Sequence, residues 1–450
     1  MKPHQSTHRP TKAALTALAL AVTGLCGLAA PAQAQSLKDL FEAARGYDAI
    51  FLAARAQAES AQYKAAQADA LNLPSVGLQA ELKRNGYDTP LGGSKSARVA
   101  SLGVSATQPL YNATNGANID KARRSLDVAA ADLQAAEQDL IVRLAQAYFD
   151  VLAAQDTLAT AQANKKGISE QLASAKRNFE VGTATITDTR EAQAKFDLST
   201  AQVLAAENDL RSKRVALDQL VGGSGVTPFS LKKVSPLPIA AGGGMDDWVT
   251  KVDSAPTVRK AQAGLDIAKM EVRRAEAGHR PTVDLNGSLG LANNRGSYAS
   301  SLGGEGTANT NSIGVTLKMP LYAGGAIQNQ VREALKLEDK ARNDLEGARR
   351  SLSQATRQAF LGVESGRSRV AALEAAESSS KLALEATQLG YKVGVRVNLD
   401  VLNAQTQLFS TQADLAKARY DLLVTSLKLR QAAGTLGAAD IDPVNVLLQP

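Results

Sequence analysis

The side chains that carry most enzyme chemistry are scarce in this sequence. Its 450 residues include one cysteine, Cys26, and three histidines, of which only His279 lies beyond residue 34. Histidine-based catalysis needs a nucleophile beside a histidine, and soft metal sites need clustered Cys and His side chains. The sequence also lacks the G-x-x-x-x-G-K-S/T loop that binds nucleotide phosphates. We therefore expect neither an enzyme nor a metal or cofactor site, and any energy must come from a partner.

Two stretches combine hydroxyl and charged side chains at matched positions. Val181–Gln193 reads VGTATITDTREAQ, and Val393–Gln405 reads VGVRVNLDVLNAQ. An offset of 212 residues aligns their Val-Gly pairs and places Asp188 opposite Asp400. Other pairs keep this offset or stay close to it: Leu210 and Leu422, Gly222 and Gly434, Tyr111 and Tyr322, Pro74 and Pro281. The offset is far too long for a solenoid repeat, so it predicts an internally duplicated chain.

Residues 1–34 have the features of a secretory signal. They contain three basic residues, an apolar run from Ala13 to Ala30 and a small-x-small cleavage pattern ending at Ala34. A membrane anchor is disfavoured because the run is short and interrupted, and lipidation at Cys26 is disfavoured by the bulky Leu25 before it. Removing the segment lowers the formal net charge from +7 to +4, which is no nucleic-acid signature. No later run approaches the ~20 apolar residues of a membrane helix, so any crossing must use strands.

Each copy begins with a helix and a strand pair. Helices are expected at about Leu37–Leu73 and Pro256–Gly278, each followed by a proline that stops it. Apolar residues then alternate with polar ones, which is typical of strands with one apolar face. Polar, glycine-containing stretches at Asn85–Ser96 and Asn293–Asn311 are predicted to be hairpin loops. The apolar members of the predicted strands are Val76, Leu78, Ala80, Leu82, Leu102, Val104, Ala106, Val283, Leu285, Leu289, Ile313, Val315 and Leu317.

Long helices follow the strands. From Pro109 to Gly182 no further proline occurs, so a helical rod roughly 100 Å long is expected. Apolar residues recur every seven positions along it, which indicates left-handed supercoiling around neighbouring helices. The chain then turns at the Val-Gly pair and returns with the same spacing. The first helix carries Ile119, Leu126, Leu133, Leu140, Ala147, Ala154, Ala161, Ile168 and Ala175 on this seam; the return helices carry Phe196, Val203, Leu210 and Leu217, then Leu408, Leu415, Leu422 and Leu429.

These patterns divide the chain into five parts. A signal peptide occupies 1–34, the first copy 35–222, a connector 223–255, the second copy 256–434 and a tail 435–450. The connector contains Trp248 and is expected, like the tail, to pack on the outside of the helices near the middle. Four strands cannot close a barrel, and open sheet edges cannot face lipid because unpaired backbone groups cost several kcal/mol each. Because the smallest membrane barrels have eight strands, the chain must associate, as a dimer or a larger oligomer.

The chain resembles the TolC-like outer-membrane efflux ducts over nearly all of its mature length. The most specific sequence motifs are VGTATITD, YKVGVRVNLDVLNAQ, the strand-to-helix links QPLYN and MPLYAGG, and ARYDLLVTSLKLRQAAGTL. The resemblance implies a mainly α protein with a membrane β-barrel: a homotrimer whose shared twelve-stranded barrel continues as a coiled-coil helical barrel. It further implies location in the outer membrane of a Gram-negative bacterium, in contact with lipid. Its expected partners are a periplasmic adaptor and an inner-membrane pump of the RND or ABC type, serving efflux or type I secretion.

The same resemblance assigns roles at the turns. It places an iris-like gate at Thr187, Asp188, Tyr391 and Arg396, in which Asp188 accepts a hydrogen bond from Tyr391 and pairs with Arg396, while Thr187 bonds Arg396. It places a cation-selecting constriction at Asp400, followed by Asn403 where the family usually has a second aspartate. Its adaptor-docking tips are Val181, Gly182, Thr183, Val393, Gly394 and Val395. Exposed contacts of ~0.2–1 kcal/mol would suit reversible opening.

Simpler roles remain open for these residues. Asp188 and Asp400 can cap the return helices, Arg396 can be a solvated charge, and Tyr391 can belong to the helix core. The two Val-Gly turns can serve chain reversal alone, because glycine readily ends a helix. At the level of the whole chain, a periplasmic coiled-coil adaptor or a structural filament would also be secreted and heptad-patterned. The adaptor would have one hairpin and β-rich domains, and the filament no strands, so four strands at duplicated positions favour the duct.

Overall fold

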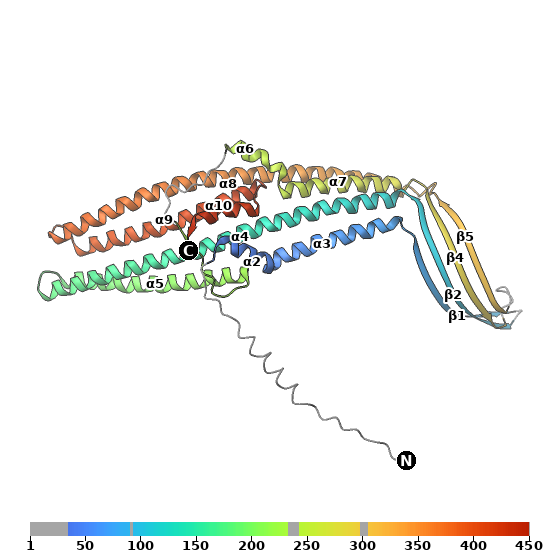
Figure 1. The fold of residues 1–450 in the computed structure, drawn as a ribbon, viewed down its shortest axis with the longest axis horizontal. Helices are drawn as coiled ribbons and strands as arrows, with labels where there is room; N and C mark the ends of the chain where they lie inside the picture. The colour runs from blue at the N-terminus through green and yellow to red at the C-terminus, as the bar shows by residue number, and fades with distance from the viewer. Residues whose placement is uncertain (1–34, 91–92, 233–242, 298–304, 450) are drawn as a thin grey trace, which may run out of the picture.

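The computed structural model describes residues 35–90, 93–232, 243–297 and 305–449, and the predicted signal peptide lies outside these residues. Long helices form a rod, and a four-stranded sheet continues the rod at one end (Figure 1). The order helix, two strands, long helix and return helix occurs in residues 37–221 and again in residues 256–432. The turns between the long helices therefore lie at the end of the rod opposite the sheet (Figure 1).

The sheet is antiparallel throughout, with the order β1-β2-β4-β5. It comprises β1 (Ser75–Thr89), β2 (Gly93–Asn112), β4 (Thr282–Arg295) and β5 (Gly306–Lys318). Pairing of β2 with β4 joins the two halves of the chain in one sheet. The extents predicted for the hairpin loops Asn85–Ser96 and Asn293–Asn311 were wrong, because the strands continue into both loops. Backbone hydrogen bonds across each hairpin sustain a strand even where the side chains are polar.

The two faces of the sheet differ in chemistry. Register and alternation place exposed aliphatic side chains on one face: Val76, Leu78, Leu82, Leu102, Val104, Leu289, Leu291, Ile313, Val315 and Leu317. The opposite face carries polar side chains: Gln79, Glu81, Lys83, Ser101, Ser105, Asn286, Ser288, Ser312 and Thr316. The predicted period-two alternation is therefore present in the sheet. On β5 the apolar face ends at Ile313, and Asn311, Asn309 and Thr307 follow on the same face toward the hairpin.

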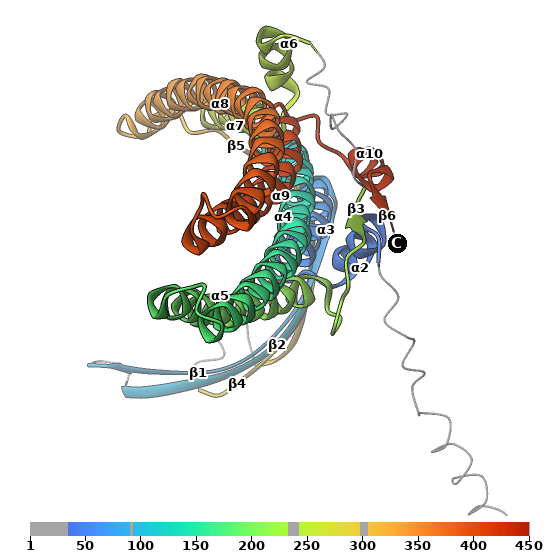
Figure 2. The same ribbon diagram turned by 90° about the vertical axis from the view of Figure 1, so that its left-hand side faces the viewer.

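The rod is built from α4 (Ala113–Glu180), α5 (Ile186–Val221), α8 (Ala326–Lys392) and α9 (Asn398–Ala432), with α7 (Pro256–Ala277) beside α8 near the sheet. α4 has 68 residues and is about 100 Å long at ~1.5 Å per residue. Viewed along the rod, the helices follow a curved wall (Figure 2). Within the described parts of the chain, no helix is both long and apolar enough to cross a membrane.

The helix predicted over Leu37–Leu73 is broken in the structure. α2 (Leu37–Tyr47) and α3 (Ala49–Asp69) meet at Asp48, whose ψ of 117° ends the helical path. The buried Asp48 carboxylate accepts a hydrogen bond from the backbone nitrogen of Phe51 at 2.8 Å and two from the Arg143 guanidinium at 3.0 and 3.1 Å. The hydrogen bond from Arg143 lowers the pKa of Asp48 below its usual value. The break therefore places the buried Asp48 carboxylate next to Arg143 of α4, which neutralises its charge.

The largest core lies midway along the rod, where α2 and the connector pack on α4. Tyr148 and Phe149 of α4 are fully buried there, with Phe41 of α2 and Leu217 of α5. The Tyr148 hydroxyl donates to the Phe229 carbonyl at 3.1 Å, and burial raises the pKa of this phenol. Around this core, β3 (Ser230–Leu231) pairs with β6 (Leu448–Gln449), beside α10 (Ile441–Val446). In the connector, α6 (Met245–Thr250) packs Trp248 against α8 and α9.

Candidate functional site at the hairpin tips

Two turns of matching geometry close the helical hairpins. Gly182 and Gly394 have φ values of +79° and +81°, the left-handed conformation that favours glycine. The carbonyl of Asn178 accepts hydrogen bonds from the backbone nitrogens of residues 183 and 184, and the carbonyl of Gly390 accepts them from residues 395 and 396. The two turns thus carry the same bonds 212 residues apart, as expected from the sequence alignment.

The start of the return helix differs between the two tips. At the first tip the Thr185 hydroxyl accepts from the Asp188 backbone nitrogen at 3.2 Å, and the Asp188 carboxylate accepts from the Thr185 nitrogen at 2.9 Å. This reciprocal capping box satisfies two otherwise free helix donors. At the second tip Val397 occupies the capping position and supplies no side-chain bond. Asp400 instead lies 3.5 Å from the Arg396 guanidinium.

The predicted gate residues lie at the tips but in two separate groups. Among the residues that the structure describes, no hydrogen bond or ion pair joins Thr187 or Asp188 to Tyr391 or Arg396 within one protomer. The Tyr391 hydroxyl, half-buried, accepts a hydrogen bond from the Asn178 side-chain nitrogen at 3.2 Å. This bond links the last turn of α8 to the last turn of α4, so the two hairpins do meet at the tip.

The predicted constriction residues lie on the first turns of α9. Asp400 is partly exposed and Asn403 is exposed. With the Arg396 cation at 3.5 Å, Asp400 is one half of a surface ion pair, which stabilises a protein by only ~0.2–1 kcal/mol. The Asp400 carboxylate therefore remains partly exposed to solvent.

A buried row of amides joins the hairpins behind the tips. The Gln405 side chain of α9 is buried and donates to the Asn164 carbonyl of α4 at 3.3 Å. Gln171 of α4 donates to the side-chain oxygen of the buried Asn398. Gly167 makes room for Gln405, because a Cβ there would lie 1.8 Å from the Gln405 amide nitrogen.

Sequence reasoning did not identify these amides. The available signals were a glycine, Gly167, inside an uninterrupted helix and polar residues on an otherwise apolar seam. Glycine within a helix costs roughly 0.5–1 kcal/mol relative to alanine, so its presence favours a packing reason. Buried amides need partners, and here α4 and α9 supply them to one another.

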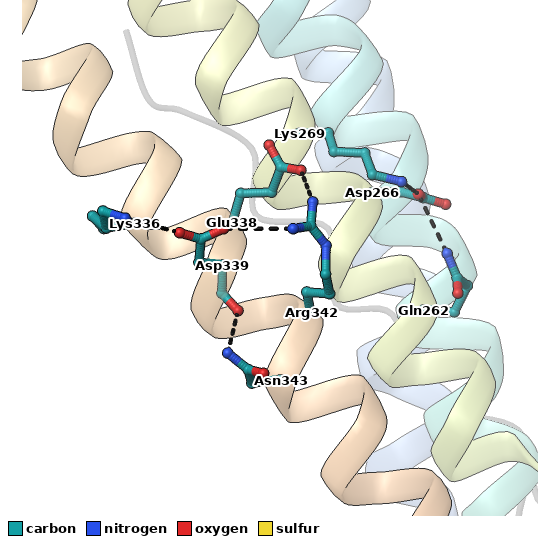
Figure 3. Close-up of polar contacts among 8 residues, drawn as sticks. All are labelled: Gln262, Asp266, Lys269, Lys336, Glu338, Asp339, Arg342 and Asn343. Carbon is teal, nitrogen blue, oxygen red and sulfur yellow. Dashed lines mark hydrogen bonds and ion pairs between the residues drawn. The ribbon is translucent and has the colours of Figure 1, made fainter.

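Charged side chains elsewhere in the described residues pair between elements about as often as they pair within single helices. Figure 3 shows two such groups: on α8, Arg342 contacts Glu338 at 2.9 Å and Asp339 at 3.5 Å, and on α7, Lys269 contacts Asp266 at 3.2 Å. Pairs three or four residues apart stabilise a helix by ~0.2–0.5 kcal/mol each. No group of three or more His, Cys, Asp or Glu side chains in the described ranges could hold a metal ion.

Comparison of folds defines the class of protein. The solved structure of the outer membrane protein VceC from Vibrio cholerae superposes with a TM-score of 0.74, covering 88% of this chain and 96% of that chain at 20% identity. The chain therefore has the fold of this outer membrane protein.

Sequence comparison assigns the family. The model of the outer membrane efflux protein family matches residues 40–223 and 252–435. Outer membrane protein TolC of Vibrio cholerae is 32% identical, covering 92% of this chain and 94% of that protein. The alkaline protease secretion protein AprF of Pseudomonas aeruginosa is 32% identical over 68% of this chain and 64% of its own. The chain belongs to the outer membrane efflux protein family and is an outer-membrane efflux or secretion channel of a Gram-negative bacterium, which confirms the family predicted from its motifs.

Proposed function

We propose that three copies of this chain assemble into an exit duct through the outer membrane and the periplasm. The observation that carries the proposal is the two-faced open sheet. Both edge strands, β1 and β5, lack a partner on their outer side in the described sheet. One face is apolar and the other polar, as a membrane barrel requires of its lipid side and its lumen. Pairing β5 of one copy with β1 of the next gives twelve strands and leaves no edge exposed to lipid.

The helices continue this duct toward the periplasm. The helices of one chain follow a curved wall (Figure 2), which we assign to one part of a helical tunnel that is entered at the turns. The tips expose apolar side chains: Val181, Val393 and Val395 are 73%, 66% and 76% exposed. Exposed apolar groups clustered at one end favour a protein partner. We assign them to a periplasmic adaptor that joins the duct to an inner-membrane pump, in a tripartite efflux or type I secretion system.

Opening is an iris-like movement of the tip helices. The proposed gate remains Thr187, Asp188, Tyr391 and Arg396, acting across hairpins and between copies. Support within one protomer is the bond from Asn178 to Tyr391, which must break if the second hairpin swings away from the first. Asp400, repeated by symmetry, forms the cation-favouring constriction, and Asn403 leaves the adjacent ring neutral.

Single-channel conductance in a planar bilayer tests the duct and its gate together. Purified wild type is expected to insert with a small conductance that rises severalfold in a Tyr391→Phe, Arg396→Ser double variant. If wild type conducts and the variant does not differ, the duct stands and the gate lies elsewhere. If neither protein inserts, the sheet forms no pore. Fractionation with the inner membrane or the soluble periplasm would then support the adaptor alternative.

The number of copies is tested by cross-linking. The described residues contain no cysteine, so one cysteine on each edge strand reports contacts between copies. Scanning cysteines along β5 around Ile313, against Leu78→Cys on β1, should yield covalent trimers at the positions in register. A product that stops at two chains would refute the trimer and leave an eight-stranded dimer.

A further inference from the structure

Three arginines lie side by side on the apolar face of the sheet, at its end away from the helices. The register pairs Arg84 of β1 with Arg98 of β2, and Arg98 with Arg295 of β4. Alternation places them on the same face as Leu82, and they follow that face's last leucine in β1. All three are exposed.

The protein itself does not neutralise this row. Within the described residues, none of the three guanidinium groups forms an ion pair or a side-chain hydrogen bond. The nearby carboxylate Glu305 accepts from the backbone nitrogen of Gly296 at 3.3 Å and pairs with no cation there. Like charges directly opposite one another on neighbouring strands are separated by about 4.5–5.5 Å at Cβ and are destabilising. A row of three such residues therefore indicates an anion supplied from outside the chain.

The position of the row specifies the kind of anion. Val76 and Arg84 lie eight positions apart on β1, about 26 Å along a strand, which is close to the ~25 Å height of the apolar band of membrane barrels. On β1 and β2 the row thus borders the apolar band directly, whereas on β4 Asn293 lies between Arg295 and Leu291. The hairpin ends lie at the end of the sheet away from the helices (Figure 1). Arginine is suited to phosphate because its planar fork donates two parallel hydrogen bonds, and its stem can lie along apolar surface.

We propose that Arg84, Arg98 and Arg295 form a binding site for the phosphate groups of an outer-leaflet glycolipid. This inference rests on the proposed function, because it takes the apolar face as the lipid side and the hairpin ends as the outer side. Assembly of three copies repeats the site around the barrel. Bound headgroups neutralise the row and hold the barrel at a fixed depth in the outer leaflet.

The chain offers a matched control on the other face. Lys83 and Lys95 lie on β1 and β2 at the same end of the sheet, and the register places both on the polar face. Replacing Arg84 and Arg98 by glutamine removes the same charge from the same two strands as replacing Lys83 and Lys95 by glutamine. An Arg84→Lys, Arg98→Lys variant keeps the charge and loses the planar fork.

Lipid retention provides the measurement. Purified protein is placed in phosphatidylcholine nanodiscs containing a small fraction of diphosphoryl lipid A, and bound lipid is quantified by native mass spectrometry. The arginine-to-glutamine pair should weaken lipid A binding by about tenfold to thirtyfold, the lysine control should match wild type, and the arginine-to-lysine pair should fall between. Lipid A without its phosphates should bind wild type no better than phosphatidylcholine does, and inorganic phosphate should not compete with the intact lipid.

Several results would overturn the proposal. Equal lipid A retention in the two double variants, arginine-to-glutamine and lysine-to-glutamine, would show that the arginines do not bind the lipid headgroup. Equal retention of dephosphorylated lipid A would exclude phosphate recognition, and full competition by inorganic phosphate would show a free-anion site. Channel conductance distinguishes failure of the lipid-site proposal from failure of the proposed channel function. Wild type that conducts but shows no lipid preference refutes the lipid site alone, whereas wild type that forms no channel refutes the membrane placement and this site with it.

Discussion

Replacing Gly167 with alanine should loosen the contact between the two hairpins. In α4, a Cβ at this position would lie 1.8 Å from the Gln405 side-chain nitrogen and 2.8 Å from its Cδ. The amide must therefore leave its place, and it loses its bond to the Asn164 carbonyl. Gln405 is 7% exposed, so water cannot easily replace that bond.

The size of the effect follows from three terms. A buried amide left without its hydrogen bond costs ~1–3 kcal/mol, and crowding of a packed site costs a further ~1–3 kcal/mol. Alanine offsets part of this loss because it is ~0.8–1 kcal/mol better than glycine inside a helix. We expect a net loss of about 1–5 kcal/mol in the contact of α4 with α9, which corresponds to about a 5- to 4,000-fold larger opening equilibrium.

Amide hydrogen exchange in α9 near Gln405 measures this opening, and single-channel conductance should rise with it. The matched control is Gly347→Ala in α8, where a Cβ would meet nothing within 4 Å, so exchange there should slow or stay unchanged. Adding Gln405→Ala to Gly167→Ala removes the clash, so the double variant should open less than the sum of the two single variants predicts. Unchanged exchange in Gly167→Ala, or strict additivity of the two substitutions, would refute the packing argument.

Three further predictions concern the core, the second tip and the constriction. Asp48→Asn should lower the free energy of unfolding by about 1–3 kcal/mol at neutral pH, because Arg143 loses its buried anion and keeps only the more exposed Asp139. Since Arg143 lowers the pKa of Asp48, wild type should lose this advantage in stability as the pH falls below about 4. The melting temperatures of both proteins, measured between pH 2 and pH 7, should therefore converge at low pH. A constant difference in melting temperature over this range would contradict the prediction. Val397→Thr should create a capping box with Asp400, raise local stability by about 1 kcal/mol and make the channel open less often; an unchanged open probability in bilayer recordings would count against it. Asn403→Asp should strengthen block by multivalent cations, and equal block in both proteins would argue against a second ring at this position.

The backbone conformation of the two hairpin tips was predictable from the local sequence. A glycine after a long helix predicts a left-handed residue, and Gly182 and Gly394 both adopt that conformation. Strand alternation was equally readable, because period two needs no knowledge of distant partners. The strand ends were not readable, since polar residues such as Asn85 and Asn294 pair through their backbones with positions on the partner strand.

Features that depend on distant partners were missed. The helix break at Asp48 is stabilised by Arg143, 95 residues away, and sequence near Asp48 gave no proline to mark it. The amide contacts depend on the register between α4 and α9, which are more than 200 residues apart at Gln405 and Asn164. For the gate, the sequence placed Asp188 at the tip and left two roles open, a gate contact and a helix cap; the structure shows the cap.

The small sheet of β3 and β6 has a consequence for the order of folding. Gln35 bridges Pro228, β3 pairs with β6, and Lys38 contacts Asp442 across a separation of 404 residues. A chain that emerges from the secretion machinery in sequence order must hold the buried face of α2 without its cover until residues 441–449 arrive. Hairpins at both ends of the rod close over short separations and can form earlier. The core in the middle of the rod is therefore completed last. Its apolar surface is exposed in the incomplete chain, which most needs protection from aggregation there.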